Sequence, residues 1–307
     1  MRIVFMGTPE FAVPCLKSLI SDGNEIVGVF TQPDKPKGRG YTLTPPPVKV
    51  TALENGLEVF QPTTLKDGTA FEILKKLNPE MIVVVAYGKI LPKEIIDLPP
   101  YGCINVHASL LPEYRGAAPI QWAVLDGKKK TGVTAMYMDI GLDTGDMLMK
   151  SETEIGENET ADELHDRLSE LGAELIVKVV HSAQQGTLIR EKQDDSKSCY
   201  AKMLTKEMSK IDFTKSAQEI HNQVRGLNSW PSAVATLNGK RIKIHKTLVA
   251  DGNGEAGQVL SLNPLVVACG SGAVEITELQ PEGKKKMPAQ SFINGLHNVR
   301  EDELKFE

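Results

Sequence analysis

The run Met81-Ile82-Val83-Val84-Val85-Ala86 says most about how this chain folds. Six consecutive apolar residues, three of them valines, are typical of a strand that is buried on both faces. A second strand pattern, at residues 102–106, follows it along the chain. Strands of this kind occur in parallel sheets that helices cover on both sides. The run therefore predicts an α/β domain with a parallel sheet at its centre.

Strand and helix patterns alternate on either side of this run. Further strands are predicted at residues 3–6, 25–30 and 133–138, and helices at 9–20, 47–55, 70–77 and 118–125. A capping box, Thr160-Ala161-Asp162-Glu163, begins a longer helix that ends near Gly186. This order predicts a mostly parallel, Rossmann-like sheet wrapped by helices.

The pattern changes after residue 189. Residues 190–208 are polar and rich in charge, which is typical of a linker. Beyond them we predict a helix at 216–226, then five short strands at 233–237, 241–247, 258–260, 265–268 and 274–279. Short strands separated by glycine-containing turns predict a small β-barrel. We therefore expect a first domain at 1–189, a linker at 190–208 and a second domain at 209–307.

The composition is that of a soluble globular protein with room for two domains. The chain has 307 residues, of which 41% are hydrophobic and 24% are charged. No apolar run approaches the ~18 residues of a membrane span, and no basic and apolar leader opens the chain. The four cysteines have no C-x-x-C spacing, so neither a zinc site nor a disulfide framework is indicated. We expect a cytoplasmic protein with reduced thiols.

The net charge of −5 excludes a uniformly basic, nucleic-acid-binding surface. Any contact with nucleic acid must therefore be local. Two basic features are candidates: a Pro- and Gly-rich loop at 33–47 with Lys35, Lys37 and Arg39, and an alternating strand with Arg241 and Lys243. Such charges are commonly solvated and without function, but they also suit contacts with phosphates.

Three polar residues suggest chemistry at the end of the second central strand. Asn105 and His107 lie two residues apart, and the period of a strand puts both side chains on one face. Asp143 follows in a turn-like stretch at 139–146. An amide donor can stabilise an oxyanion, and an imidazole beside a carboxylate can move protons near neutral pH. The set fits acyl-type transfer; alternatively, His107 caps a strand and Asp143 holds a turn.

The larger motifs resemble the active-site signature of the folate-dependent formyltransferases. They are Asn105-x-His107, Ser109-Leu110-Leu111-Pro112-x-Tyr114-Arg115-Gly116 and Asp143-Thr144-Gly145. The likeness covers essentially the whole chain, since residues 2–12, 31–40 and 228–231 also fit the branch of that family that acts on methionyl-tRNA. The resemblance implies the formyltransferase fold with a C-terminal, OB-like barrel that binds tRNA. It also implies that N10-formyltetrahydrofolate gives its formyl group to initiator methionyl-tRNA and leaves as tetrahydrofolate.

The resemblance also implies roles for particular residues. The catalytic set would be Asn105, His107 and Asp143, without a metal. The residues that line the folate site would be Ser109, Leu110, Leu111 and Pro112, and those that contact tRNA would be Lys35, Lys37, Arg39, Arg241 and Lys243. A monomer without membrane contacts is expected.

Two other functions are compatible with parts of the sequence. A formyltransferase for a small amine, such as a ribonucleotide or an amino sugar, would share the catalytic residues. It would need neither the tail domain nor the 33–47 loop. A non-catalytic RNA-binding protein on the same scaffold would not need Asn105, His107 and Asp143 together. We therefore expect a transferase that acts on charged tRNA.

Overall fold

The computed structural model of the protein describes residues 1–37, 42–296, 300–301 and 304–307. The chain forms two compact units. The N-terminal unit comprises Met1–Gly116, Thr131–Thr153 and His165–Tyr200, and the C-terminal unit comprises Ala117–Lys130, Glu154–Leu164 and Ala201–Glu307. Residues 117–130 and 154–164 thus belong to the C-terminal unit, although they precede most of it in the sequence. The domain boundaries expected from the sequence, at 1–189, 190–208 and 209–307, stay a prediction.

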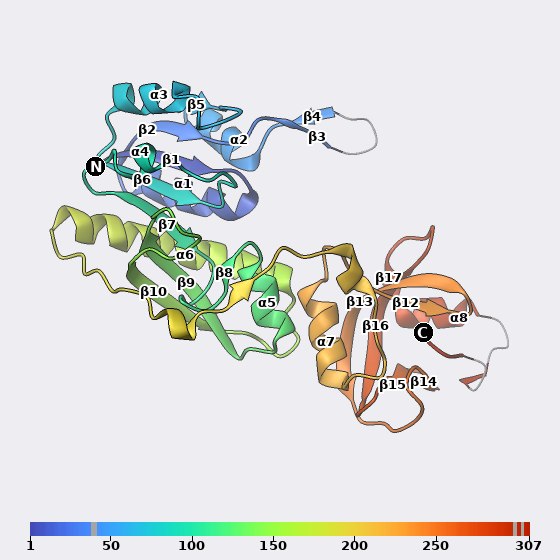
Figure 1. Cartoon of the computed structure of the whole chain (residues 1–307). Helices are drawn as coiled ribbons and strands as arrows, with labels where there is room; N and C mark the ends of the chain where they lie inside the picture. Colours follow the sequence, from blue (N-terminus) through green and yellow to red (C-terminus); the bar gives the residue numbers. More distant parts are fainter. Residues whose placement is uncertain (38–41, 297–299, 302–303) are drawn as a thin grey trace. The chain divides into compact units, whose positions relative to one another are not determined.

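A seven-stranded sheet forms the centre of the N-terminal unit (Figure 1), in the order β10-β9-β7-β6-β1-β2-β5. The strands are β1 (Arg2–Gly7), β2 (Glu25–Phe30), β5 (Val59–Phe60), β6 (Met81–Val85), β7 (Cys103–His107), β9 (Lys130–Tyr137) and β10 (Met147–Glu154). Five neighbouring strands pair in parallel, in the order β7, β6, β1, β2 and β5. Strand β9 runs antiparallel to β7. The prediction of a mostly parallel, Rossmann-like sheet is confirmed.

Helices cover both faces of this sheet. All five residues of β6 are buried, as the apolar run predicts. On one face, Val4 and Met6 of β1 share a hydrophobic core with residues of α3 (Thr69–Leu77) and α4 (Lys93–Ile96). In the described part of the chain, no helix combines the length and the apolar character needed to cross a membrane.

The long helix α6 (Ala161–Gln184) covers the other face. Gly172 of this helix lies close to Val106 of β7, so a larger side chain there would crowd the strand. The predicted capping box is confirmed, because the N–H of Thr160 donates to Glu163 Oε2 and the N–H of Glu163 donates to Thr160 Oγ1. The other helices of the first 165 residues include α1 (Val13–Ser21), α2 (Pro47–Glu54) and α5 (Pro119–Leu125).

Two parts of the N-terminal unit differ from the sequence prediction. No strand was expected at β10, where Lys150, Glu152 and Glu154 are exposed and alternate with half-buried neighbours. This polar pattern is typical of a strand at the edge of a sheet. The 33–47 loop contains a short hairpin, in which β3 (Lys35–Lys37) pairs antiparallel with β4 (Thr42–Thr44).

An antiparallel sheet forms the C-terminal unit, in the order β12-β13-β16-β15-β14, with β17 beside β16. The strands are β12 (Ala233–Leu237), β13 (Lys240–Ala250), β14 (Val259–Leu262), β15 (Leu265–Ala268), β16 (Ala273–Pro281) and β17 (Met287–Pro288). α7 (Ala217–Gly226) packs on β13 and β16 (Figure 1), and α8 (Ala289–Asn294) packs on β16. The five predicted strands and the predicted helix are all present.

The end of the chain pairs with both outer strands of this sheet. Phe306 forms a bridge with Leu237 of β12, and Lys305 forms a bridge with Gln258, next to β14. Backbone hydrogen bonds of 2.7 and 2.8 Å join Thr236 and Glu307 in both directions. Part of each outer edge of the sheet is therefore covered by the last residues of the sequence.

A buried histidine connects three elements of the C-terminal unit. His221 of α7 is 2% exposed. Its Nδ1 accepts from Thr247 Oγ1 at 3.0 Å, and its Nε2 donates to the carbonyl oxygen of Glu157 at 3.1 Å. Burial lowers the pKa of this imidazole and the charge of Arg225 lowers it further, while the hydrogen bond to Glu157 partly opposes both. The folded protein therefore favours the neutral ring.

The C-terminal unit is expected to lose stability as the pH falls through about 6.5, the ordinary pKa of histidine. Below that pH the unfolded chain binds a proton that the folded His221 resists, so protonation favours unfolding. The chain's two tryptophans, Trp122 and Trp230, both lie in this unit, so urea unfolding followed by their fluorescence reports on it. His221→Gln should weaken the pH dependence of the midpoint.

The matched control is His181→Gln, at a histidine of the N-terminal unit whose side chain is 49% exposed. This change should leave the pH dependence of the tryptophan transition as it is in the unmodified chain. An unchanged pH dependence in His221→Gln would contradict the assignment.

Candidate active site

The site begins at the carboxyl end of β7. His107 is the last residue of the strand, and Asn105, two residues earlier, lies on the same face. In open α/β sheets, ligands bind at this end of the parallel strands. Asn105 is half-buried, and within the described residues its carboxamide makes no hydrogen bond. The two side chains lie together as the sequence predicted, and the amide can donate to a ligand.

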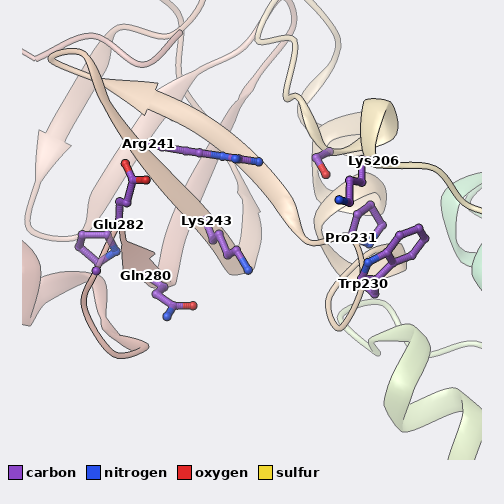
Figure 2. A pocket seen from close by; sticks show the side chains of 10 residues that line it. Lys206, Trp230, Pro231, Arg241, Lys243, Gln280 and Glu282 are labelled. Carbon is purple, nitrogen blue, oxygen red and sulfur yellow. The ribbon is translucent and has the colours of Figure 1, made fainter. Parts of the chain in front are cut away.

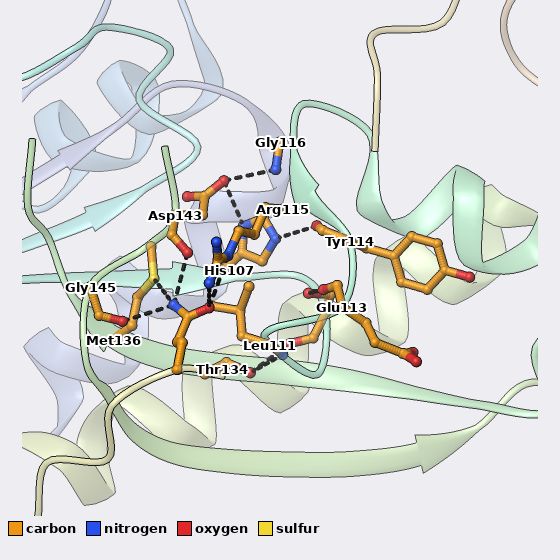
Figure 3. A network of polar contacts seen from close by, with 12 residues as sticks. His107, Leu111, Glu113, Tyr114, Arg115, Gly116, Thr134, Met136, Asp143 and Gly145 are labelled. Atoms are coloured by element: carbon orange, nitrogen blue, oxygen red, sulfur yellow. Dashed lines mark hydrogen bonds and ion pairs between the residues drawn. The ribbon is translucent and has the colours of Figure 1, made fainter. Parts of the chain in front are cut away.

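The imidazole of His107 is held by a backbone carbonyl. The residue is 6% exposed, and its Nε2 lies 2.8 Å from the carbonyl oxygen of Tyr114 (Figure 3). Because a carbonyl only accepts, Nε2 must carry the hydrogen of that bond. The other ring nitrogen, Nδ1, faces Asp143 Oδ2 at 3.7 Å. Nδ1 is therefore the ring nitrogen that is available to exchange a proton with a ligand.

Asp143 is positioned by its own turn and by a neighbouring loop. Its Oδ2 accepts the backbone N–H of Gly116 at 2.9 Å (Figure 3). Its φ of 54° lies in the left-handed region, which is costly for a residue other than glycine. At 3.7 Å, the carboxylate is too far from His107 for a direct hydrogen bond, and it is close enough to stabilise the imidazole when the ring is protonated. The structure thus brings the three candidate catalytic residues together.

A residue that the sequence analysis missed, Gln193, fixes the same turn. Its Nε2 donates to the carbonyl oxygens of Asp143 and Gly145, both at 2.8 Å. Its Oε1 accepts two hydrogen bonds from Arg115, at 3.0 and 2.8 Å. Arg115 also pairs with Asp195 at 2.8 Å, so its guanidinium has a structural role. No periodicity or motif points to Gln193, which lies within the predicted linker.

The loop after β7 is held by its own hydrogen bonds. Ser109 is fully buried, and its Oγ donates to the carbonyl oxygen of Glu113 at 2.6 Å. Thr134 of β9 donates to the carbonyl oxygen of Ser109 and accepts from the N–H of Leu111 (Figure 3). Leu110 and Pro112 are half-buried. The role of residues 109–112 in folate binding stays a prediction.

The residues predicted to contact tRNA belong to both units. Lys35 and Lys37 lie in β3 of the N-terminal unit, and Lys35 is exposed. Arg39 lies outside the described residues. Arg241 and Lys243 of β13 are exposed in the C-terminal unit, and exposed and buried residues alternate from 241 to 244, as predicted.

Arg241 and Lys243 line a cavity of about 420 Å³ in the C-terminal unit (Figure 2). Lys206 and Trp230 also contribute to its wall, and the indole of Trp230 is about half exposed. In the described part of the chain, neither Arg241 nor Lys243 forms an ion pair. Three cations beside an exposed aromatic ring are typical of a surface that binds nucleic acid.

Comparison with known proteins identifies the family. Residues 1–180 match the formyl transferase family, and residues 203–297 match the C-terminal domain of formyl transferases.

The chain belongs to the formyl transferase family.

Members of this family resemble the chain over nearly its whole length. A methionyl-tRNA formyltransferase of Citrifermentans bemidjiense is 52% identical over 297 residues, which cover 96% of this chain and 93% of that protein. One from Clostridium novyi is also 52% identical, with 96% and 97% covered. The family uses formyltetrahydrofolate as its formyl donor. Within the described residues, no three His, Cys, Asp or Glu side chains are grouped so that they could hold a metal ion.

A solved structure supports the fold. The N-formyltransferase from Helicobacter canadensis, in complex with folinic acid and dTDP-3-aminofucose, aligns with a TM-score of 0.68. The two proteins are 20% identical, and the alignment covers 93% of this chain and 99% of that one. At this identity the likeness establishes the shared fold of the family.

The hydrogen bond to Tyr114 predicts the tautomer of His107. When the ring is neutral, the proton should be on Nε2 and absent from Nδ1, because the carbonyl must receive a hydrogen. NMR of the protein with ¹⁵N-labelled histidine, at mildly alkaline pH, distinguishes the two nitrogens. The resonances of His107 are identified by their loss in His107→Gln. A neutral ring with its proton on Nδ1 would contradict the geometry.

Proposed function

We propose that this enzyme transfers the formyl group of N10-formyltetrahydrofolate to the free amino group of methionine esterified to initiator tRNA. The product is N-formylmethionyl-tRNA, which serves translation initiation. The observation that carries the proposal is the 52% identity to a methionyl-tRNA formyltransferase through both units of the chain. The presence of the tail does not by itself exclude a small amine, because the N-formyltransferase solved with dTDP-3-aminofucose also aligns over 93% of this chain. Its identity is only 20%, so it is the high identity through both units that favours methionyl-tRNA.

The first chemical requirement is stabilisation of an oxyanion. Attack of the amine on the formyl carbon gives a tetrahedral carbon that bears a negatively charged oxygen. The carboxamide of Asn105, which makes no hydrogen bond within the described residues, supplies an N–H donor for that oxygen. Loss of one such donor typically lowers the rate ~10²–10³-fold.

The second requirement is movement of protons. The folate nitrogen must gain a proton as its bond to carbon breaks, and the attacking amine must lose one. Nδ1 of His107 is the group that exchanges them, because Nε2 is engaged by Tyr114. The carboxylate of Asp143 stabilises the ring when it is positively charged. General acid–base help of this kind is worth ~10²–10⁴ in rate.

The folate is proposed to lie along residues 109–112. The hydroxyl of Ser109 is already bonded to the carbonyl of Glu113, so this residue contributes the shape of the loop. Leu110 and Pro112 are only half-buried and offer an apolar surface for a flat ring. Leu111 packs in a buried hydrophobic cluster with Met136 of β9 and Met147 of β10, and this packing anchors the loop to the sheet.

The C-terminal sheet is proposed to be an OB-like barrel that binds the body of the tRNA. The pairing of residues 305–307 with β12 and with Gln258 supports closure, since it links the two ends of the strand order. Arg241 and Lys243 would contact phosphates, and Trp230 offers a face for a base. Lys35, Lys37 and Arg39 of the hairpin region would contact the acceptor end.

We further propose that the enzyme works as a monomer in the cytoplasm. All four cysteines are free, as in a reducing compartment, and three of them are buried. Burial raises the pKa of the Cys15 thiol to about 12, so that it stays protonated and unreactive.

The function is tested by a formyl-transfer assay with three acceptors side by side: charged initiator tRNA, charged elongator tRNA and an amino sugar nucleotide. Transfer should be fastest to initiator methionyl-tRNA. His107→Ala should lower transfer by at least ~10² while tRNA affinity changes less than about twofold. Transfer to the amino sugar nucleotide alone would overturn the proposed substrate, and an equal loss of transfer and affinity would overturn the role of His107.

Arg241→Ala combined with Lys243→Ala should weaken tRNA binding and flatten its dependence on salt. Each lost phosphate contact is expected to reduce the slope of log affinity against log salt by about one. The control is Lys240→Ala with Lys246→Ala, which removes the same charge from the same strand outside the cavity. Equal slopes for the two double variants would show that the cavity is not the contact surface.

A further inference from the structure

Gln193 stands out among the residues that the proposed mechanism does not use. From Gln184 to Tyr200, all of which the structure describes, it is the only buried residue, at 6% exposure. The segment around it is tied to the sheet by a bridge between Met147 and Glu191, with two backbone hydrogen bonds of 2.8 Å. A buried amide in an otherwise exposed stretch is costly unless its hydrogen bonds are satisfied.

Those hydrogen bonds are all made within the site. The two hydrogens on Nε2 go to the carbonyl oxygens of Asp143 and Gly145, and Oε1 accepts twice from Arg115. A primary amide can make about four hydrogen bonds, two as donor and two as acceptor, so Gln193 has no capacity left for a ligand. Its contribution must therefore be made through the residues that it holds.

The hydrogen bonds form a closed ring around the Asp143 carboxylate. Gln193 pins the backbone on both sides of Thr144, and the guanidinium of Arg115 pins Gln193. The next residue along, Gly116, donates its N–H to Asp143 Oδ2. The turn and the loop are thus fixed to each other at two places. This fixation offsets the strain of the positive φ at Asp143.

Gly145 adds a second constraint on the same turn. A Cβ atom at this position would collide with the carbonyl oxygen of Tyr137 on β9, so the turn approaches the strand closely. This close contact between two backbones leaves the turn little room to move toward β9. The hydrogen bonds from Gln193 keep the turn from moving away from it.

We propose that Gln193 is a positioning residue, which keeps Asp143 Oδ2 facing Nδ1 of His107 during formyl transfer. The inference rests on the proposed catalytic role of Asp143 and extends it to a residue of the segment that follows α6. Without the two donated hydrogen bonds, the strained turn relaxes and the carboxylate leaves its place. A misplacement of about 1 Å in a catalytic group costs on the order of 10² in rate.

The test is Gln193→Glu, which keeps the size of the side chain and the acceptor for Arg115 but removes both donors. In single-turnover formyl transfer to charged initiator tRNA, the rate at saturation should fall about 10²-fold. The affinity for tRNA and the KM for the folate should change less than about twofold. The saturated rate of Gln193→Met, which adds no charge, should fall by about the same factor. This variant replaces Gln193→Glu in the test if the Glu variant does not fold.

A double-mutant cycle separates positioning from a loss of folded protein. In an Asp143→Asn background, Gln193→Glu should lower the residual rate less than about twofold, because the group that it positions is already disabled. The matched control is Gln223→Glu, at a glutamine of α7 whose Nε2 also donates to two backbone carbonyls, those of Met208 and Lys210. This control should leave the saturated rate unchanged.

The failures are distinguishable. A saturated rate within about threefold of the unmodified enzyme in both Gln193 variants, with Asp143→Asn still inactive, would overturn the inference alone. The same loss in both backgrounds would also overturn it, since a general loss of folded protein acts equally in each. Full activity of Asp143→Asn would overturn the proposed mechanism and the inference with it.

Discussion

The hydrogen bond from Nε2 of His107 to the carbonyl oxygen of Tyr114 determines what the rest of the site can do. It assigns one nitrogen of the ring to a permanent partner and leaves the other for chemistry. The free nitrogen is the one that faces Asp143. A ring that is 6% exposed cannot turn over without breaking this bond in surroundings of low polarity, where an unpaired donor is costly. In the proposed mechanism, the backbone of a loop therefore determines which nitrogen of His107 transfers the proton.

That loop depends on contacts far from it in the sequence. Thr134 of β9 donates to the carbonyl of Ser109 and accepts from the N–H of Leu111, so the neighbouring strand shapes the path that leads to Tyr114. Gln193 and Gly116 fix the opposing turn. The candidate catalytic residues thus come from a strand and a turn, and a third segment, around Gln193, holds the turn by hydrogen bonds.

The sequence predicted well the parts of the fold that depend on burial of apolar side chains. The ranges 233–237 and 265–268 coincide with β12 and β15, and the run at 81–86 with β6 and one further residue. Strand β10 escaped prediction because its exposed positions are charged and its other face is only half-buried. Gln193 escaped because its burial follows from partners 48 and 50 residues away, and a single polar residue has no period. Spacing predicted that Asn105 and His107 share one face of a strand, and the structure confirms this placement. Residue type and the resemblance to the family added Asp143, which lies 3.7 Å from His107, and the catalytic role of the three residues stays a prediction.

The pairing of the last residues with β12 and with the region before β14 has a consequence for biosynthesis. A ribosome makes a chain from its N-terminus and keeps the newest residues inside its exit tunnel, so residues 304–307 emerge after the strands with which they pair. The backbone groups of Thr236 and Gly257 must therefore wait until Phe306 and Glu307 have left the tunnel. Unpaired strand edges invite pairing with other chains, so this interval is when the unit is most exposed to aggregation. The C-terminal sheet is thus most vulnerable while its outer strands wait for a segment that is made after both of them.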